Sequence, residues 1–371
     1  MRVKGLMSAL VCVYLLFSFY STTTNACTGV RLIAEDGSTV YGRSMEWGAF
    51  DLNTRVAIIP RGYGFTGLTP EGHNGKNWRA KYGFVGLDML EKDIYTDAMN
   101  EKGLSVGVFY HPGFASYKEY DKAQANNTIT AFDVPSYILS QFATIDEVKK
   151  GMEGVRVVSI EEEVIGIPAF AHWIVTDPSG KSIVIEYLDK ELRIFKNPLG
   201  VITNGPTYDW HMMNLRNYVN LSPVAFPAKK MEGLEFAPLG AGSGMLGLPG
   251  DFTPPSRFVR AVAWSQTTRP LKNSDEAVYE LFRILDNFNL PLGSAEGSDS
   301  EVTNLKGMRS STIWTTGWDL SKKVLHFHTQ HNRRVRTVEL DRIDFSKKEI
   351  VHIPLDDKKE QDVKDITPIM K

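Results

Sequence analysis

The stretch CTGVRLIAEDGSTVYGRSMEW, residues 27–47, contains two strand-like runs on either side of Asp36-Gly37. Asp-Gly between two such runs is a strong signal for a β-hairpin. We therefore expect an antiparallel hairpin here, at the start of a strand-rich fold. A two-residue turn at Asp36-Gly37 would pair Glu35 with Ser38.

The expected register decides which side chains meet at the open end of this hairpin. Counting back from the turn places Cys27 opposite Glu46, and directly opposed residues have Cβ atoms about 5 Å apart on one face of the sheet. Arg43 lies three residues from Glu46, so it points to the other face of an unbroken strand. A bulge near Gly42 would bring all three side chains together.

Residues 1–26 differ in character from the rest of the chain. Two basic residues, Arg2 and Lys4, precede an apolar run from Leu6 to Tyr20, and a short polar segment ends at Ala26. The apolar run is shorter than the roughly 20 residues that a membrane-spanning helix needs. This pattern predicts a secretory signal peptide, residues 1–26, that is removed after Ala26. We expect an exported protein without a membrane anchor, located in a bacterial periplasm.

The two cysteines of the chain are Cys12, within the apolar run, and Cys27, directly after the predicted cleavage site. The mature protein would therefore hold one thiol and no internal disulfide. Three interpretations of Cys27 are open: a packing residue, the lipid-bearing residue of an exported binding lipoprotein without catalytic activity, or a nucleophile that cleavage creates. Lipoprotein signals normally have an aliphatic residue three positions before the cysteine, where this chain has Thr24.

Length and composition bound the class of the protein. The chain has 371 residues, of which 42% are hydrophobic and 23% charged, and these values are ordinary for a globular protein that folds in water. Its formal net charge of -2 provides no basic excess to attract phosphate backbones, so nucleic acid is not an expected partner. No linker or internal repeat divides the sequence, and we expect residues 27–371 to form a single domain.

Strands and helices are predicted in blocks along the rest of the chain. Helical patterns cover residues 134–142, a short segment behind Thr144, and residues 277–288 after Asn273. Such blocks favour an α+β fold over a doubly wound parallel sheet. The expected strand pairs are 172–176 with 182–187, 192–195 with 201–203, and 311–315 with 324–329.

Two other patterns carry weak signals for a binding site. Residues 242–247 have the spacing of a dinucleotide fingerprint, but a proline-containing loop follows where a helix should begin. His326, His328 and His331 lie on a strand pattern without a nearby cysteine or acidic cluster. We therefore expect neither a cofactor nor a metal.

An N-terminal cysteine would combine a thiol and an amine on one residue. The α-amine has an ordinary pKa of about 7.7 to 8.0 and the thiol one near 8.5, so the amine can take the thiol proton near neutral pH. A histidine is then not needed as a general base. Such a site still requires donors to the oxyanion that forms on the attacked carbonyl, and a cation beside the thiolate.

Five segments along the chain form a specific combination of motifs. They are Cys27-Thr28-Gly29, Tyr41-Gly42-Arg43-Ser44-Met45-Glu46-Trp47, Asp97-Ala98-Met99-Asn100-Glu101-Lys102-Gly103-Leu104, Ile202-Thr203-Asn204-Gly205-Pro206, and Gly247-Leu248-Pro249-Gly250-Asp251 with Ser256-Arg257-Phe258. Together they resemble the choloylglycine hydrolase family of N-terminal nucleophile hydrolases, which contains penicillin V acylases and conjugated bile salt hydrolases. The resemblance covers nearly the whole mature chain. It implies an αββα sandwich, with two antiparallel sheets between helix layers, that hydrolyses linear amides.

The resemblance also implies roles for individual residues. Cys27 would be the nucleophile, with Arg43 beside it. Asn204 would donate to the oxyanion, and Arg257 would order the site. Glu46 stands where the family usually has Asp, and we expect it to hold the α-amine.

Tyr110 bears on the substrate. The resemblance places it where penicillin V acylases tend to have Tyr and bile salt hydrolases Asn, and its side chain or main chain would serve the oxyanion site. We therefore expect penicillin V or a long-chain N-acyl homoserine lactone as substrate, and a nearest resemblance to the penicillin V acylases of Gram-negative bacteria. Conjugated bile salts are the alternative.

Homotetramers are common among proteins of this type, so the resemblance is compatible with a homotetramer. The walls of a hydrophobic acyl pocket are expected among Trp47, Met89, Phe109, Tyr110 and Phe114.

Overall fold

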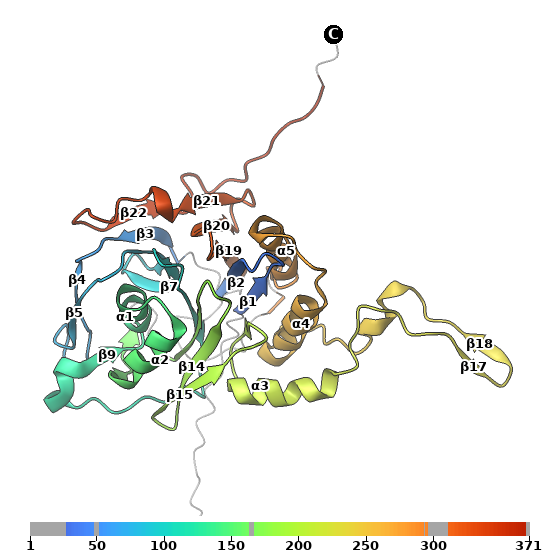
Figure 1. Cartoon of the computed structure of the whole chain (residues 1–371), viewed down its shortest axis with the longest axis horizontal. Coiled ribbons are helices and arrows are strands. Elements are labelled where there is room, and N and C mark those ends of the chain that lie inside the picture. The colour runs from blue at the N-terminus through green and yellow to red at the C-terminus, as the bar shows by residue number, and fades with distance from the viewer. Residues whose placement is uncertain (1–26, 48–51, 163–166, 293, 296–310, 369–371) are drawn as a thin grey trace, which may run out of the picture.

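The computed structural model describes residues 27–47, 52–162, 167–292, 294–295 and 311–368, and the predicted signal peptide lies outside them. Two antiparallel sheets form the centre of the molecule (Figure 1). The first, sheet A, has six strands, in spatial order β16 (Val201–Ile202), β1 (Thr28–Ile33), β2 (Thr39–Trp47), β19 (Ser311–Asp319), β20 (Val324–Thr329) and β21 (Arg336–Glu339).

The second, sheet B, has eight strands. Their spatial order is β15 (Glu191–Lys196), β14 (Ser182–Leu188), β13 (Ala171–Thr176), β8 (Ser105–Tyr110), β7 (Ile94–Asn100), β6 (Phe84–Met89), β3 (Arg55–Ile59) and β22 (Val351–Pro354).

Helices cover the outer face of each sheet. The helices are α1 (Val134–Gln141) and α2 (Ile145–Glu153) beside sheet B, α4 (Pro254–Thr267) and α5 (Ser274–Asp286) beside sheet A, and α3 (Tyr208–Asn214), which follows β16. One hydrophobic cluster joins the inner faces of both sheets to α4 and α5, and a second joins the outer face of sheet B to α1 and α2. The α+β class and the αββα layering are thus confirmed.

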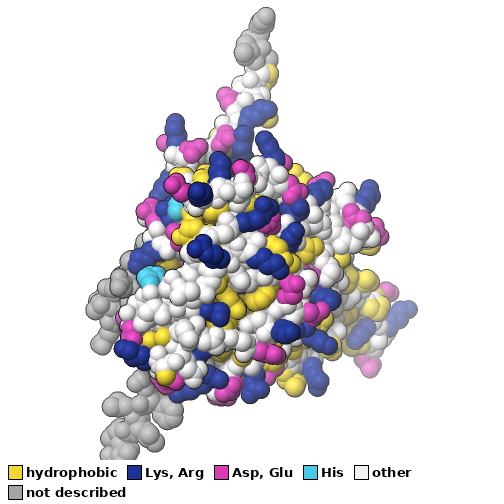
Figure 2. All heavy atoms as spheres, turned by 60° about the vertical axis from the view of Figure 1, so that its left-hand side comes forward, with side chains coloured by type: hydrophobic (Ala, Val, Ile, Leu, Met, Phe, Trp, Pro, Cys, Tyr) yellow, Lys and Arg dark blue, Asp and Glu magenta, His cyan; other side chains and the backbone are white. Residues whose placement is uncertain are grey.

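Shorter elements surround this core. A hairpin of β17 and β18 projects away from the body of the molecule (Figure 1). In the described ranges, no helix has the length and hydrophobicity needed to cross a bilayer. On the face shown in Figure 2, acidic and basic side chains are intermixed. The short elements are β4 (Gly64–Thr66), β5 (Asn77–Arg79), β9 (Thr128–Thr130), β10 (Arg156–Val158), β11 (Glu161–Glu162), β12 (Ile167–Pro168), β17 (Lys229–Met231), β18 (Leu234–Phe236), and the 3-10 turns η1 (Lys122–Asn127), η2 (Leu215–Tyr218), η3 (Ala241–Met245) and η4 (Leu340–Arg342).

The first hairpin is present, but its register differs by one residue from the expected one. Thr28 lies opposite Ser44, so Cys27 approaches Met45 rather than Glu46. The cause is a longer turn, because Ala34 N donates to Ser38 O and Gly37 adopts a positive φ of 83°. Three-residue turns with glycine in the left-handed region are a common hairpin type. A shift of one residue moves side chains to the opposite face of the sheet.

Most other elements agree with the sequence pattern. The pairs β13–β14 and β19–β20 are confirmed, and Asn273 caps α5 by accepting a hydrogen bond from Glu276 N. The expected pairing of 192–195 with 201–203 is wrong, because β15 pairs with β14 and β16 pairs with β1. The crossing of β16 to sheet A brings the segment after it, which contains Asn204, next to Cys27.

Candidate active site

Cys27 lies immediately before β1 and is buried, with 3% of its surface exposed. Its Sγ atom lies 3.7 Å from Met45 Sδ and 3.9 Å from the main-chain oxygen of Glu46. The same residue lines a cavity whose walls are almost entirely apolar. Predominantly apolar walls are usual for small-molecule sites.

Three of the five residues expected in the walls of an acyl pocket line this cavity. Trp47, Met89 and Tyr110 line it, and the rings of Trp47 and Tyr110 meet edge to face at 6.3 Å. Phe109 and Phe114 do not line it. Phe109 packs under the Arg43 guanidinium, and Phe114 stacks on His111. Further apolar walls come from Ile94, Phe132, Pro135, Pro168 and Phe170.

Arg43 projects from β2 toward sheet B and is completely buried. Strands β7 and β8 are paired only from Asp97–Gly107 to Met99–Ser105, so their backbones separate beyond that point. Arg43 bridges this opening, because its Nη1 donates to the carbonyl of Thr96, at 3.0 Å, and to that of Val108. The guanidinium is thereby fixed on the face of sheet A that carries Cys27, and both residues line the cavity.

Asn204 and Arg257 meet at the Cys27 main chain. Asn204 Oδ1 accepts hydrogen bonds from the Cys27 nitrogen, at 2.9 Å, and from Arg257 Nη2, at 2.8 Å. Arg257, on α4, also donates through Nη1 to the Cys27 carbonyl and to Thr28 Oγ1. Asn204 Nδ2 donates one hydrogen to the Tyr110 carbonyl, at 2.7 Å. An amide nitrogen carries two hydrogens, so the second can serve a ligand.

The Tyr110 backbone offers another donor beside Asn204. His111 N donates to Phe170 O, which makes Tyr110 and Ala171 a non-hydrogen-bonded pair of the β8–β13 ladder. The N–H and C=O of Tyr110 therefore point away from β13, on the side where Asn204 reaches the carbonyl. The Tyr110 side chain lines the cavity instead, and burial raises its pKa to about 12.

Glu46 is on the other face of β2 from Arg43 and is absent from the cavity lining. Its carboxylate accepts from Thr312 Oγ1 at 3.1 Å, while the Cys27 nitrogen donates to Asn204. This placement corrects the expected pairing of Cys27 with Glu46, and it follows from the longer turn. No bulge at Gly42 is present: β2 runs without a register shift there against both β1 and β19.

The charges of the site are held in a buried environment. Burial raises the pKa of the Cys27 thiol, and the guanidinium of Arg43 is the main opposing influence. Burial also raises the pKa of Glu46 to about 7, against the charge of Arg257. Asp97, which accepts from Thr316 and Trp318 at 2.6 Å, has its pKa raised by burial to about 6, against the charge of Arg43. Sequence reasoning assigned Asp97 no role, although it lies within one of the quoted motifs.

Two groups among the described residues have the spacing of metal ligands. The first comprises His111, His172 and Glu186 and is buried, and the second comprises Asp88, Asp93 and His352. Asp88 is bound to Arg55 by an ion pair of 2.6 Å. Neither group includes His326, His328 or His331. The His111 and His172 rings are stacked at 4.0 Å with 5° between their planes, so their nitrogens do not converge on one point.

Comparison with known proteins decides the family. Linear amide C-N hydrolases of the choloylglycine hydrolase family match residues 27–353. The chain belongs to the choloylglycine hydrolase family. It is a linear amide hydrolase of the N-terminal nucleophile class, and the family match begins at Cys27.

Curated relatives of this choloylglycine hydrolase include enzymes of both substrate types. A bile salt hydrolase/transferase of Clostridium perfringens is 31% identical over 87% of this chain and 95% of that protein. One from Bifidobacterium longum is 30% identical over 88% of this chain and 99% of that protein. A penicillin V acylase of Pectobacterium atrosepticum is 27% identical over 93% of this chain and 88% of that protein.

Solved structures give the same order. A variant of the conjugated bile acid hydrolase from Clostridium perfringens matches with a TM-score of 0.79 and 28% identity, covering 92% of this chain and all of the other. The penicillin V acylase from Agrobacterium tumefaciens matches with a TM-score of 0.70 and 26% identity, covering 89% and 92%. The bile salt hydrolases are thus more similar to this chain than these penicillin V acylases, which corrects the nearest resemblance expected from the sequence.

Proposed function

We propose that this choloylglycine hydrolase cleaves conjugated bile salts and related amides that join an apolar acyl group to a polar amine. The observation that carries the proposal is the position of Cys27, which combines the wall of an apolar cavity with contacts to Asn204 and Met45. The higher similarity to bile salt hydrolases favours the bile salt as the first substrate. The Tyr110 ring in the cavity is the specific observation for a second candidate, penicillin V or a long-chain N-acyl homoserine lactone.

The proposed mechanism starts with removal of residues 1–26, which gives Cys27 a free α-amine. The amine takes the thiol proton, and the sulfur attacks the substrate carbonyl to form a C–S bond. The second hydrogen of Asn204 Nδ2 and the Tyr110 N–H stabilise the oxyanion. Arg43 provides the positive charge beside the thiolate. The C–N bond then breaks, and the protonated α-amine gives its proton to the leaving amine.

Hydrolysis of the thioester completes the cycle. The neutral α-amine takes a proton from water, and the hydroxide adds to the thioester carbonyl. The C–S bond breaks, the acid leaves, and the thiolate regains its proton from the α-amine. Asn204 Oδ1, which accepts from the Cys27 nitrogen, would orient the amine through both halves of the reaction.

Substrate competition tests the proposal. The relative kcat/KM on glycocholate, penicillin V and a long-chain acyl homoserine lactone should be highest for glycocholate. A clear preference for penicillin V would instead support the second candidate, which rests on the Tyr110 ring in the cavity. Cys27→Ser should fold normally and lose most activity on all three substrates, whereas full activity of this variant would remove Cys27 from the mechanism.

Export and an unanchored N-terminus are part of the proposal. The family match that begins at Cys27 supports cleavage after Ala26. An exported lipoprotein without catalytic activity would carry a diacylglyceryl group on Cys27 and a blocked amine. Mass spectrometry of the periplasmic fraction from a bacterial host distinguishes a free cysteine, a lipidated one and a retained signal peptide.

We also propose that copies of the chain associate into a homotetramer through the β17–β18 arm. A lone two-stranded hairpin is marginally stable in water, and it is stabilised when it packs against another surface. Exposed apolar side chains on and beside the arm would supply that contact. Light scattering should give a tetramer for the wild type and a smaller species for Leu234→Glu, and a monomeric wild type would contradict the proposal. The exposed side chains are Val224, Phe226, Met231, Leu234, Phe236 and Leu239.

A further inference from the structure

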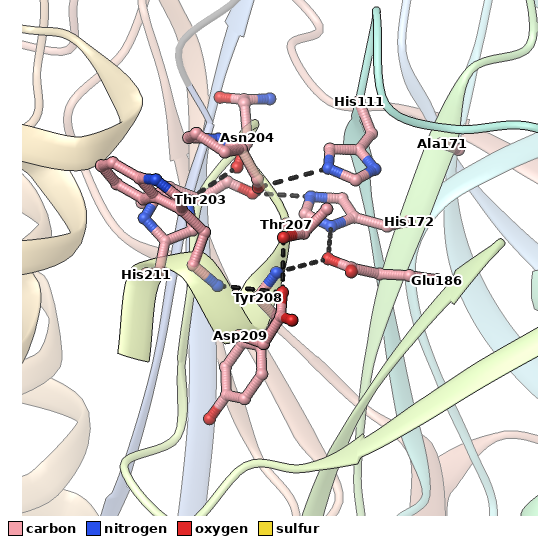
Figure 3. Close-up of polar contacts among 12 residues, drawn as sticks. His111, Ala171, His172, Glu186, Thr203, Asn204, Thr207, Tyr208, Asp209 and His211 are labelled. Carbon is pink, nitrogen blue, oxygen red and sulfur yellow. Dashed lines mark hydrogen bonds and ion pairs between the residues drawn. The ribbon is translucent and has the colours of Figure 1, made fainter. Parts of the chain in front are cut away.

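The loop that carries Asn204 is held by three buried histidines (Figure 3). His172 Nε2 lies 2.8 Å from the Thr203 carbonyl oxygen, and His211 Nε2 lies 3.1 Å from that of Asn204. His111 Nε2 lies 3.3 Å from the carbonyl oxygen of Pro206, two residues further along the loop. A carbonyl oxygen only accepts hydrogen bonds, so each of these nitrogens must carry a hydrogen.

Glu186, on β14, connects the two ends of the same loop. Its Oε1 lies 3.0 Å from His172 Nδ1 and accepts from the Tyr208 N–H, also at 3.0 Å. One end is thus reached through His172, which binds Thr203, and the other through the first residue of α3. Both Glu186 and His172 are buried, so these bonds are shielded from bulk solvent.

The pair needs a proton between its two members. His172 Nε2–H is committed to Thr203, so a bond to Glu186 requires a proton shared by Nδ1 and Oε1. Burial raises the pKa of Glu186 to about 7 and lowers that of His172 to about 3, which favours a protonated carboxyl that donates to a neutral ring. His111, which stacks on His172, and the Tyr208 N–H act against burial on the pKa of Glu186, and the charge of Asp209 acts in the same direction as burial.

We propose that His172 and Glu186 are positioning residues that fix the amide of Asn204 at the oxyanion site. They do not contact the substrate cavity, and they act through the Thr203 carbonyl and the Tyr208 N–H. The inference rests on the proposed function of Asn204 and adds the residues on which its orientation depends. Burying a polar pair costs desolvation free energy, and β13 and β14 are already joined by their backbone hydrogen bonds. The pair therefore adds little to the sheet, but it can hold the attached loop in one orientation.

The variant Glu186→Gln tests the positioning role, because glutamine has nearly the same size and shape as glutamate. Oε1 now serves two partners: as a hydroxyl it donates to His172 and still accepts from Tyr208. An amide group placed there either donates or accepts but cannot do both, so one bond is lost. We expect kcat to fall by about tenfold to a hundredfold, the effect of a displacement near 1 Å at a reacting group. KM should stay within about twofold, because the acyl cavity is untouched.

Asp177→Asn is the matched control. Asp177 is a buried carboxylate in the turn of the same β13–β14 hairpin, where it accepts from Ile145 N and Ser179 N. Its replacement should lower the thermal unfolding midpoint and leave kcat unchanged. If Glu186→Gln and Asp177→Asn have the same loss of stability and both keep the wild-type kcat, Glu186 has only a structural role.

A second pair of variants tests the contact between His211 and the Asn204 carbonyl. His211→Gln keeps an N–H donor near the position of Nε2, whereas His211→Leu removes it. The glutamine variant should retain most of the wild-type kcat, and the leucine variant should lose it with little change in KM. Equal kcat values for both would overturn the positioning role of this contact.

A crystal structure of Glu186→Gln separates this inference from the proposed function. Inactivity of the wild-type enzyme on every amide would refute the proposed function alone. In either case, the inference predicts that Asn204 Nδ2 moves out of hydrogen-bond distance of the Tyr110 carbonyl in the variant. An unchanged Asn204 position would refute the inference.

Discussion

Replacement of Glu46 by glutamine should stabilise the protein in alkaline solution and leave its stability unchanged in acid. Glu46 is completely buried, and its pKa is raised from 4.5 to about 7 by that burial, against the charge of Arg257. Between these two values the folded state binds more protons than the unfolded state. The free energy of unfolding therefore falls as the pH rises through this window. Each pH unit corresponds to about 1.4 kcal/mol, so the wild type loses about 3 kcal/mol in total from this group.

Glutamine mimics the protonated carboxyl and does not titrate. Below pH 4.5 the two proteins should be equally stable, and at pH 8 Glu46→Gln should be more stable by about 3 kcal/mol. Asp97 also titrates, with a pKa of about 6, but it is present in both proteins and cancels in the difference. Urea unfolding of wild type and variant at pH values from 4 to 8 measures that difference. Glu349→Gln, an exposed position, is the control and should show none.

Parallel stability curves for the wild type and Glu46→Gln would refute this reasoning, because they would mean that Glu46 titrates normally in the folded state. The kinetic result is separate. If Glu46 holds the α-amine, kcat falls in the variant at every pH, and if Glu46 only supports the fold, kcat is retained.

Three further substitutions test the contacts around Cys27. Arg43→Met removes the charge that most lowers the pKa of the Cys27 thiol. The rate of Cys27 alkylation by iodoacetamide should therefore rise at a higher pH than in the wild type. An unchanged pH profile of alkylation would contradict the role of Arg43. Asn204→Ala removes an oxyanion donor, and kcat should fall by about 100-fold to 1,000-fold in steady-state assays; a loss confined to KM would reassign Asn204 to substrate binding. Tyr110→Phe should keep kcat on glycocholate, because the backbone of Tyr110 and not its hydroxyl faces Asn204; a large loss would place the hydroxyl in the reaction.

The pattern of strands and helices predicted the α+β class, and the family resemblance implied the layers, but the face to which each side chain points stayed open. Asp36-Gly37 fits both a two-residue and a three-residue turn, and the choice between them determines whether Glu46 or Met45 approaches Cys27. Nothing local in the sequence separates the two turns, because both place glycine where a positive φ is needed.

Long-range contacts within the site depend on topology. Cys27 and Asn204 are 177 positions apart, and their contact exists because β16 joins sheet A beside β1. The strand pattern alone favoured a hairpin of 192–195 with 201–203, and in that arrangement Asn204 would remain with sheet B. The family resemblance identified Asn204 and Arg257, since it carries information on topology that periodicity lacks.

The histidine-bound loop was missed, although the sequence contains a signal for it. His172 and Glu186 are a histidine and a glutamate within two mostly apolar, buried strands, AHWIVT and SIVIEYL. Buried polar side chains require partners, so a histidine and a glutamate in neighbouring buried strands indicate a hydrogen-bonded pair. Their connection to Thr203 could not be read from the sequence, because it depends on where the loop after β16 lies.

The most direct test of the account is intact-protein mass spectrometry of the active enzyme, before and after a rapid acid quench with substrate. The resting enzyme should begin at an unmodified Cys27. The quenched sample should contain a species heavier by the mass of the acyl group, bound to the peptide that contains Cys27. An active enzyme that retains residues before Cys27, or carries the acyl group elsewhere, would contradict the assignment of Cys27 as an N-terminal nucleophile.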